Sequence, residues 1–181
     1  MELELIKFFQ SLTCDFLDVI FFGASFLGSW IGFVICFTFM LLFSNKIYSL
    51  FFAGTYGIGV AINWILKSVI NKLRPYQIDL SIVDRLHANG SSMPSGHTVS
   101  AIIICIFLIF IICKTAKHKN TKVISVFFII LFFIMVVISR MYLGQHFLTD
   151  ILAGMAVGTV VSVFGLIAYK YRKNGDKTNL K

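Results

Sequence analysis

Five apolar segments divide the chain, and short polar stretches separate them. They cover residues 27–43, 47–70, 98–113, 123–138 and 147–169. Most are close to the ~20 residues that an α-helix needs to cross the hydrocarbon core of a bilayer. None alternates apolar and polar residues as the strands of a membrane barrel do. The pattern therefore predicts an all-α fold, a polytopic membrane bundle of about five transmembrane helices.

The first 26 residues follow a different pattern. Acidic side chains interrupt the apolar ones, and the apolar residues recur at helical spacing. This predicts an N-terminal amphipathic helix that lies at the membrane interface, with insertion of residues 16–26 as the alternative, so that the bundle would have six helices. The membrane-embedded domain then covers residues 27–170, and residues 171–181 form a basic tail.

The composition agrees with a membrane protein. Of the 181 residues, 58% are hydrophobic and 13% are charged, and the mean hydropathy is +0.89. In soluble domains about a quarter of all residues are charged, which is well above the fraction in this chain. Small residues recur every fourth position at Ala53, Gly57 and Ala61, and again at Gly154 and Gly158, which predicts faces where helices approach closely. Such faces serve contacts within and between chains alike, so they define no oligomeric state.

The basic residues predict the orientation. Five spans place the turn between the first two spans, the loop between the third and fourth, and the C-terminal tail on one side. Those segments contain Lys46, Lys114, Lys117, Lys119, Lys122, Lys170, Arg172, Lys173, Lys177 and Lys181. The positive-inside rule makes this side cytoplasmic in a multi-pass protein of the cell membrane. The net charge of +8 is then explained by topology and by contact with anionic lipid headgroups, and it does not indicate nucleic-acid binding.

Other ionisable residues lie at the opposite, extracytoplasmic ends of the spans or in the loop between them. They are Lys67, Lys72, Arg74, Asp79, Asp84, Arg85, His87, His97, Arg140, His146 and Asp150. A charge at membrane depth is costly, so each is a candidate for function. Taken singly, Lys67 and Arg74 could equally be interfacial anchors, although their spacing of two helical turns places them on one face. We expect a solvated loop for Asp79, Asp84, Arg85 and His87.

Asp150 lies inside the start of the last span, where an unpaired carboxylate costs several kcal/mol. His146 is four residues earlier, so the two side chains share a helix face within hydrogen-bonding reach. In that arrangement Asp150 accepts the Nδ1 proton of His146 and leaves Nε2 free as a nucleophile, as in the histidine–carboxylate half of a hydrolase triad. A structural capping pair would have the same spacing.

The residues around this pair favour an anion over a metal ion. His97, His146 and Asp150 are suitable ligand types for zinc or iron. Three cations, Lys67, Arg74 and Arg140, are predicted on the same side of the membrane. Together they would repel a divalent cation but complement a phosphate group, to which arginine offers a planar fork and lysine a point charge. The electrostatics therefore predict an anion pocket and no metal site.

The segment Pro94-Ser95-Gly96-His97 precedes the third span. Backbone N–H groups at the start of a helix bind anions, Ser95 adds a hydroxyl, and Gly96 allows an oxyanion close to the backbone. His97 follows directly, where it can donate a proton to an oxygen leaving phosphorus. This predicts that His97 is a general acid.

Three motifs resemble the signatures of the type-2 phosphatidic acid phosphatase superfamily, in the family's order. The first is K-x6-R-P from Lys67 to Pro75, the second is P-S-G-H at residues 94–97, and the third is S-R-x5-H-x3-D from Ser139 to Asp150. The ordered set is far more specific than any single motif. The resemblance covers residues 67–150 and extends to the small helical membrane architecture.

The resemblance implies a role for each matched residue. His146 would attack phosphorus and form a phosphohistidine, Asp150 would orient it, and His97 would protonate the leaving group. The phosphoryl oxygens would be held by Lys67, Arg74, Ser95, Gly96 and Arg140. No metal or other cofactor is expected, and the expected partners are the bilayer and a lipid phosphate or diphosphate.

The family includes lipid phosphatases and, more distantly, vanadium haloperoxidases that bind vanadate in the same pocket. An extracytoplasmic site favours hydrolysis of undecaprenyl diphosphate to undecaprenyl phosphate, by analogy. Phosphatidylglycerophosphate and phosphatidate are the alternative substrates. A transporter that binds a lipid phosphate without cleaving it is the alternative of a different class, although it would make no use of the histidine–aspartate pair.

Overall fold

The computed structural model describes the backbone of residues 1–178 and the side chains through residue 174. The described part contains helices and no strand. The elements are α1 (Glu2–Ser11), α2 (Asp15–Leu27), α3 (Trp30–Phe43), α4 (Lys46–Ile70), α5 (Pro75–Ile78), α6 (Gly96–Thr115), α7 (Lys119–Tyr142) and α8 (Leu148–Thr178).

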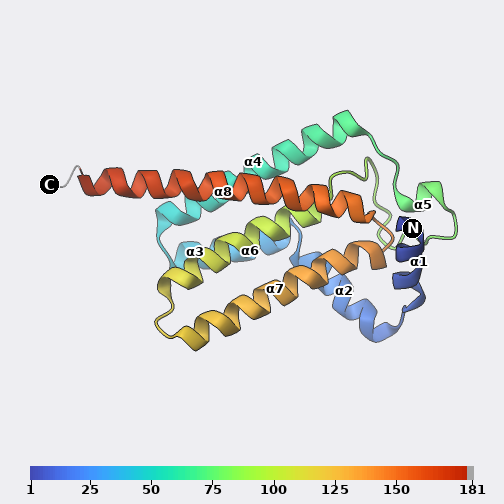
Figure 1. The fold of residues 1–181 in the computed structure, drawn as a ribbon, viewed down its shortest axis with the longest axis horizontal. Helices are drawn as coiled ribbons and strands as arrows, with labels where there is room; N and C mark the ends of the chain where they lie inside the picture. Colours follow the sequence, from blue (N-terminus) through green and yellow to red (C-terminus); the bar gives the residue numbers. More distant parts are fainter. Residues whose placement is uncertain (179–181) are drawn as a thin grey trace.

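Four long helices form the body of the molecule, and a bent pair completes it. Helices α4, α6, α7 and α8 are each long and apolar enough to cross a bilayer. Helices α2 and α3 meet that condition only together, with a bend of 60° between them. The long helices run side by side along the length of the molecule (Figure 1). The predicted all-α membrane bundle is thereby confirmed, and the predicted number of about five spans is reached when the bent pair is taken as one span.

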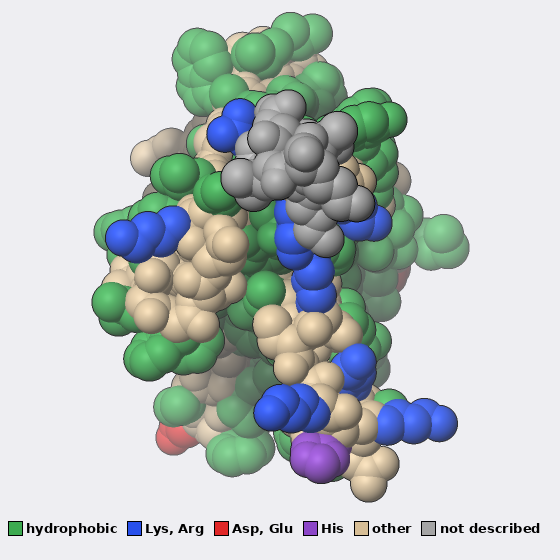
Figure 2. Space-filling model, turned by 90° about the vertical axis from the view of Figure 1, so that its left-hand side faces the viewer, with side chains coloured by type: hydrophobic (Ala, Val, Ile, Leu, Met, Phe, Trp, Pro, Cys, Tyr) green, Lys and Arg blue, Asp and Glu red, His purple; other side chains and the backbone are tan. Residues whose placement is uncertain are grey.

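The two ends of the bundle differ. The α3–α4 turn, the α6–α7 turn and the C-terminal part of α8 lie at one end, and α1, α5, the segment 79–95 and the α7–α8 connection lie at the other (Figure 1). Lys and Arg side chains are scattered over the first end with little acidic charge among them (Figure 2). We call this the basic end, and the opposite one the loop end. The three basic segments identified in the sequence therefore lie together.

The N-terminal segment differs from its prediction. The sequence predicts a single helix over residues 1–26, whereas the structure has two, α1 and α2, separated at residues 12–14. Ser29 starts α3 as its N-cap, with its Oγ accepting from the Ile31 N–H at 3.2 Å. The predicted first span at residues 27–43 is therefore only the second part of a bent α2–α3 pair.

Helix α1 packs against the loop end of the bundle. Lys7 forms an ion pair with Asp79 at 2.9 Å. Gln10 donates to the Val83 carbonyl oxygen at 2.8 Å and accepts from the Val83 N–H at 3.1 Å. Ile6 is fully buried. These contacts attach α1 to the segment that follows α5, so α1 supports the loops at this end.

Small residues allow two of the closest helix contacts. Helix α8 approaches α6 at Gly154 and Gly158, and a Cβ added to Gly158 would lie 1.8 Å from Ile102 Cγ2. The predicted close approach at this pair is confirmed. On α4 the prediction is wrong for Gly57, which faces outward with no atom within 4 Å of an added Cβ; Gly59 packs against α6 instead.

Candidate active site

The predicted site residues meet at the loop end, although they come from four separate parts of the chain. Lys67 is in the last turn of α4, Arg74 precedes α5, Arg140 is near the end of α7, and His146 precedes α8. All four lie close enough to His97, in the first turn of α6, to act on its charge. The structure therefore brings two imidazoles and three cations together.

Asp150 is the point at which the three motif segments join. Its Oδ1 accepts from Lys72 Nζ at 2.7 Å. Its Oδ2 accepts from the Phe147 N–H at 2.9 Å and from Ser92 Oγ. Its carbonyl oxygen accepts from the Ser95 N–H at 3.0 Å. Because the side chain is fully buried, the positive charge of Lys72 and these donors compensate the cost of its desolvation.

His146 faces Asp150 but does not reach hydrogen-bonding distance. Nδ1 of His146 lies 3.7 Å from Oδ2 of Asp150, and Nδ1 is buried without a hydrogen bond to any described residue. The sequence predicts a hydrogen bond between these atoms. In the structure Ser92 and the Phe147 N–H occupy Oδ2, so the two side chains are neighbours but are not bonded.

The surroundings of His146 keep its imidazole neutral. Burial lowers the pKa of His146 to about 4. The positive charges of Arg74, Arg140 and Lys67 act in the same direction, and Asp150 opposes them. A lowered pKa means that protonation begins only at more acidic pH. One ring nitrogen of the neutral imidazole therefore keeps its lone pair throughout the neutral range, as a nucleophile requires.

This electrostatic environment gives a result that can be measured directly. We expect the carbon-13 signal of His146, assigned by its loss in His146→Gln, to titrate with a midpoint near pH 4. An ordinary histidine, with a pKa of about 6.5, is roughly 90% protonated at pH 5.5, whereas His146 would be almost entirely neutral there. Nuclear magnetic resonance of the histidine-labelled protein in nanodiscs gives this curve without substrate. A midpoint at pH 6 or above would contradict the burial described here.

Two of the three predicted phosphate-binding cations brace the neighbouring loop. Arg74 donates from Nε to the Gly90 carbonyl oxygen at 3.0 Å, and from Nη2 to that of Asn89 at 3.2 Å. Its Nη1 donates to both the backbone and the side-chain oxygen of Gln145 at 3.2 Å. Lys67 Nζ donates to the Ser91 carbonyl oxygen. Both side chains therefore fix the loop that leads to α6, in addition to supplying positive charge.

Arg140 is placed differently. Its side chain is 1% exposed, and Nε donates to Ser139 Oγ at 3.2 Å. Its Nη2 is buried and makes no hydrogen bond within the described part of the chain. A buried guanidinium with an unused donor is costly unless an anion is bound to it. Of the three cations, Arg140 is therefore the one whose hydrogen-bonding capacity remains open for phosphoryl oxygens.

The start of α6 presents backbone donors beside this cluster. Ser95 is the N-cap, and its Oγ accepts from the Thr98 N–H at 3.4 Å. Gly96 begins the helix, and Pro94 lies two residues before it. A Cβ on Gly96 would lie 3.2 Å from Asn63 Nδ2, which shows how closely the chain passes α4 here. The N–H groups of this first turn suit an anion.

His97 also borders an apolar cavity of about 880 Å³. The bent pair α2–α3 supplies Phe22, Phe26 and Trp30 to its wall, and Leu86 closes it from the loop. Phe26 and Trp30 are exposed at this surface. His97 therefore lies between the cluster of cations and a hollow that a hydrocarbon chain can fill.

Sequence reasoning assigned no role to several residues that the structure places at the site. Lys72 and Ser92 hold Asp150, as described above. Gln145 connects Arg74 to Asp84, whose Oδ1 accepts from Gln145 Nε2 at 2.6 Å. Lys72 lies within the first motif and Ser92 lies next to the second, so their positions in the sequence could have indicated a role at the site. Gln145 is at an unspecified position of the third motif, and nothing in the sequence indicated its role.

The loop that follows α5 is also more ordered than predicted. A solvated loop was expected for Asp79, Asp84, Arg85 and His87. Instead, Asp79 is tied to α1 and Asp84 to Gln145, and Arg85 forms an ion pair with Asp18 of α2. Hydrogen bonds from Lys7 and Ser81 lower the pKa of Asp79 well below its usual value. Of the four, only His87 is without such a side-chain contact among the described interactions.

The described residues include no group of three His, Cys, Asp or Glu side chains that could hold a metal ion. What the fold and the site residues define is a helical membrane protein with a cluster of cations and imidazoles beneath the loops at one end. The chain belongs to the PAP2 superfamily, which it matches over residues 48–174. The resemblance seen in the three motifs is thereby confirmed.

Curated proteins and solved structures from several organisms resemble the chain, and two of the relatives are bacterial lipid phosphatases. Phosphatidylglycerophosphatase B of Bacillus subtilis (strain 168) is 33% identical over 110 residues, which are 59% of this chain and 50% of the relative. Undecaprenyl-diphosphatase BcrC of the same organism is 28% identical over 111 residues, 61% of this chain and 52% of the relative. The chain thus spans about half the length of these relatives.

The likeness in three dimensions covers nearly the whole chain. The crystal structure of a transmembrane PAP2 type phosphatidylglycerolphosphate phosphatase from Bacillus subtilis superimposes with a TM-score of 0.77 at 22% identity. The match includes 99% of this chain and 86% of the other. At that identity, the comparison shows a shared fold.

Proposed function

We propose that this protein is a membrane lipid phosphatase that works through a phosphohistidine at His146. The observation that carries the proposal is the cluster in which buried His146 and half-buried His97 lie among Lys67, Arg74 and Arg140. A neutral nucleophile, a proton donor and uncompensated positive charge are the groups that phosphoryl transfer needs. Membership of the PAP2 superfamily supports the same class of reaction.

In the first step, Nε2 of His146 attacks phosphorus and the bond from phosphorus to the leaving oxygen breaks. His97, protonated once the negative charge of the bound phosphate offsets the neighbouring cations, donates its proton to that oxygen, so the lipid leaves neutral if it is an alcohol. Asp150 stabilises the imidazole of His146 as it becomes positive. The gap of 3.7 Å between them need close only slightly, and catalytic hydrogen bonds commonly shorten once substrate is bound.

In the second step, a water molecule attacks the phosphohistidine. His97, now neutral, takes a proton from that water, and the bond between phosphorus and Nε2 breaks to release inorganic phosphate. Arg140 and the N–H groups at the start of α6 stabilise the charge that spreads over the phosphoryl oxygens in both steps. Lys67 and Arg74 contribute positive charge and hold the loop in place.

The apolar cavity beside His97 supports a lipid as the substrate. A chain lying between α2, α3 and the loop would leave its phosphate end at His97, where the cavity meets the cations. We propose undecaprenyl diphosphate as the first candidate, which would give undecaprenyl phosphate and inorganic phosphate. Phosphatidylglycerophosphate is the second, because the relative with 33% identity is a phosphatidylglycerophosphatase. The loop end would face outward, with the basic end in the cytoplasm.

The test is phosphate release by the purified protein from undecaprenyl diphosphate, phosphatidylglycerophosphate and phosphatidate, compared as initial rates. We expect hydrolysis of at least one lipid, unchanged by EDTA and blocked by vanadate, which has the shape and charge of the phosphoryl group in transfer. His97→Ala should lose most of its rate on a lipid alcohol leaving group but much less on a good leaving group such as p-nitrophenol, which needs no proton.

The same assay separates the phosphatase from the rival transporter. Binding of all three lipids without phosphate release would favour a carrier that holds the headgroup and does not cleave it. If His97→Ala kept full activity on a substrate with a lipid alcohol as the leaving group, His97 would not be the general acid. The ratio of initial rates on the three lipids decides among the candidate substrates.

A further inference from the structure

A small polar pocket lies beside His97, between the start of α3, the middle of α4 and the first turns of α6. Its volume is about 260 Å³, and at about 30 Å³ for each water molecule it has room for several of them. It shares Ser29, Trp30 and His97 with the apolar cavity described above. The two hollows therefore meet at His97, and one of them is polar.

Asn63 is the residue of this pocket whose hydrogen-bonding capacity is open. It lies one turn before Lys67 on α4, on the same face and about 6 Å deeper in the bundle at 1.5 Å per residue. Asn63 is 9% exposed, and its Oδ1 is buried and accepts no hydrogen bond from any described residue. An amide oxygen without a donor at membrane depth is costly, so it marks a position where a donor binds.

The other polar groups of the pocket also lie on α4 and α6. The hydroxyl groups of Tyr56 and Ser100 share a hydrogen bond at 3.0 Å, so each already has a partner. The amide of Asn63 lies close to Gly96, the residue before His97. Asn63 and His97 therefore line the same small space from two helices, and Oδ1 of Asn63 is the acceptor that has no donor there.

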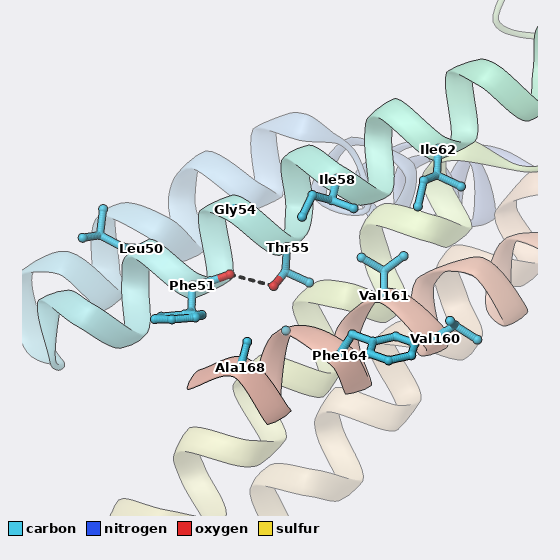
Figure 3. A pocket seen from close by; sticks show the side chains of 11 residues that line it. Leu50, Phe51, Gly54, Thr55, Ile58, Ile62, Val160, Val161, Phe164 and Ala168 are labelled. Carbon is cyan, nitrogen blue, oxygen red and sulfur yellow. Dashed lines mark hydrogen bonds between the residues drawn. The ribbon is translucent and has the colours of Figure 1, made fainter. Parts of the chain in front are cut away.

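A groove on another face of α4 shows the contrast. It has a volume of about 710 Å³ and runs between α4 and α8 (Figure 3). Thr55 supplies its single polar side chain, and the Thr55 hydroxyl donates to the Phe51 carbonyl oxygen at 2.7 Å (Figure 3). All other side chains that line this groove are apolar, so water gains little there. The polar pocket beside His97 suits water better.

The second step of the proposed reaction needs a water molecule on one particular side of phosphorus. Phosphoryl transfer is in line, so the attacking and the leaving atoms lie on opposite sides of phosphorus. In the second step Nε2 of His146 is the leaving atom. Water must therefore attack from the side that the lipid oxygen occupied, and this is the side on which His97 donates its proton. A water molecule that waits beside His97 is on the correct side.

We propose, on the basis of the proposed phosphatase function, that this pocket holds the water that hydrolyses the phosphohistidine and that Asn63 positions it. The water donates one hydrogen to Asn63 Oδ1 and the other to neutral His97, which leaves a lone pair on its oxygen for phosphorus. As the new bond from oxygen to phosphorus forms, the bond from phosphorus to Nε2 of His146 breaks and its electron pair returns to Nε2. The proton of the water moves to His97, which is then ready to act as the acid again.

The rate at which the phosphohistidine decays tests this proposal. The full-length protein in nanodiscs is labelled with radiolabelled undecaprenyl diphosphate, or with phosphatidylglycerophosphate should wild type hydrolyse only that lipid, and is then chased with unlabelled lipid. Asn63→Leu keeps the size of the side chain and removes the acceptor. We expect it to lose label about 100-fold more slowly than wild type, as for a misplaced reacting group. Its kcat/KM should be unchanged, because kcat/KM depends on the steps that form the phosphohistidine.

Matched variants separate positioning of water from packing of α4. Asn63→Asp keeps an acceptor oxygen at the same place, so it should restore most of the wild-type rate of label loss. Thr55→Val removes another buried polar group from the same helix and should lose label as wild type does. Because Oδ1 of Asn63 has no donor among the described residues, Asn63→Leu should not lower the melting temperature.

The outcomes distinguish this proposal from the proposed function. Label loss from Asn63→Leu at the wild-type rate would overturn the assignment of Asn63 and leave the phosphatase intact. An equal slowing of label formation and label loss would also overturn it, because Asn63 would then act on the phosphate or on His97 in both steps. Equally slow label loss in Thr55→Val would assign the effect to packing. If wild type itself released no phosphate and carried no label, the proposed function would fall, and this proposal with it.

Discussion

Replacing His146 with alanine is expected to reduce turnover by about 10⁴-fold or more, the loss seen when a catalytic nucleophile is removed from a hydrolase. The reason is specific: without Nε2 no covalent phosphoenzyme forms, and the cations alone can only position the lipid and stabilise charge. The measurement is the initial rate of phosphate release from whichever lipid the wild type hydrolyses. A second readout is the acid-labile phosphoprotein that radiolabelled substrate should leave on wild type after rapid quenching.

The matched control is His118→Ala. His118 is exposed beside α7 at the basic end, so its loss removes an imidazole without touching the site. It should retain the wild-type rate and the labelled intermediate. If His146→Ala kept more than a few per cent of the activity, or still carried label, the nucleophile would have to be another group. Binding of vanadate by the inactive variant would show that the pocket remains formed.

Arg140→Met is expected to lower kcat/KM by about 10²- to 10³-fold, because a buried donor to the phosphoryl oxygens is lost. The same change should raise the melting temperature of the unliganded protein. Arg140 is 1% exposed and its Nη2 has no hydrogen-bond partner among the described residues, so the wild type bears the cost of a poorly compensated buried charge. An apolar side chain of similar length removes that cost. Activity and thermal unfolding in detergent would be measured on the same preparation.

Vanadate and a second arginine provide the controls. Vanadate should raise the melting temperature of wild type, because it binds the folded state, and should do so much less in Arg140→Met. Arg85 already forms an ion pair with Asp18, so Arg85→Met should lower the melting temperature. A fall in stability for Arg140→Met equal to that for Arg85→Met would show that Arg140 is a structural residue.

The fold was predictable from the sequence where the apolar segments are long and continuous. Helices α4, α6, α7 and α8 follow directly from the hydrophobic pattern, because a bilayer demands a minimum length of apolar helix. The N-terminal helices could not be predicted in the same way. Hydrophobicity indicates which residues lie in lipid but does not indicate where a helix bends. The bend between α2 and α3 depends on Gly28 and on the cap at Ser29, a local signal that a hydropathy pattern does not contain.

The site was predictable in its members and not in its internal contacts. Three ordered motifs identify the residues that meet beside His97, because each motif lies at the end of a span. The same motifs suggest a hydrogen bond from His146 to Asp150. In the structure Lys72 and Ser92 hold that carboxylate instead. The path of the loop decides which donors lie within hydrogen-bonding distance of each Asp150 oxygen. That path depends on tertiary packing, which the spacing of residues along the chain does not specify.

The position of His97, beside both the apolar cavity and the charge of Arg140, has a consequence for product release in the proposed phosphatase reaction. Under the proposed function, a bond cut at this boundary would divide the substrate between two phases. The apolar product would move sideways into the bilayer, and the phosphate would move toward the water at the loop end. The two products would then leave by different routes, so neither would have to wait for the other.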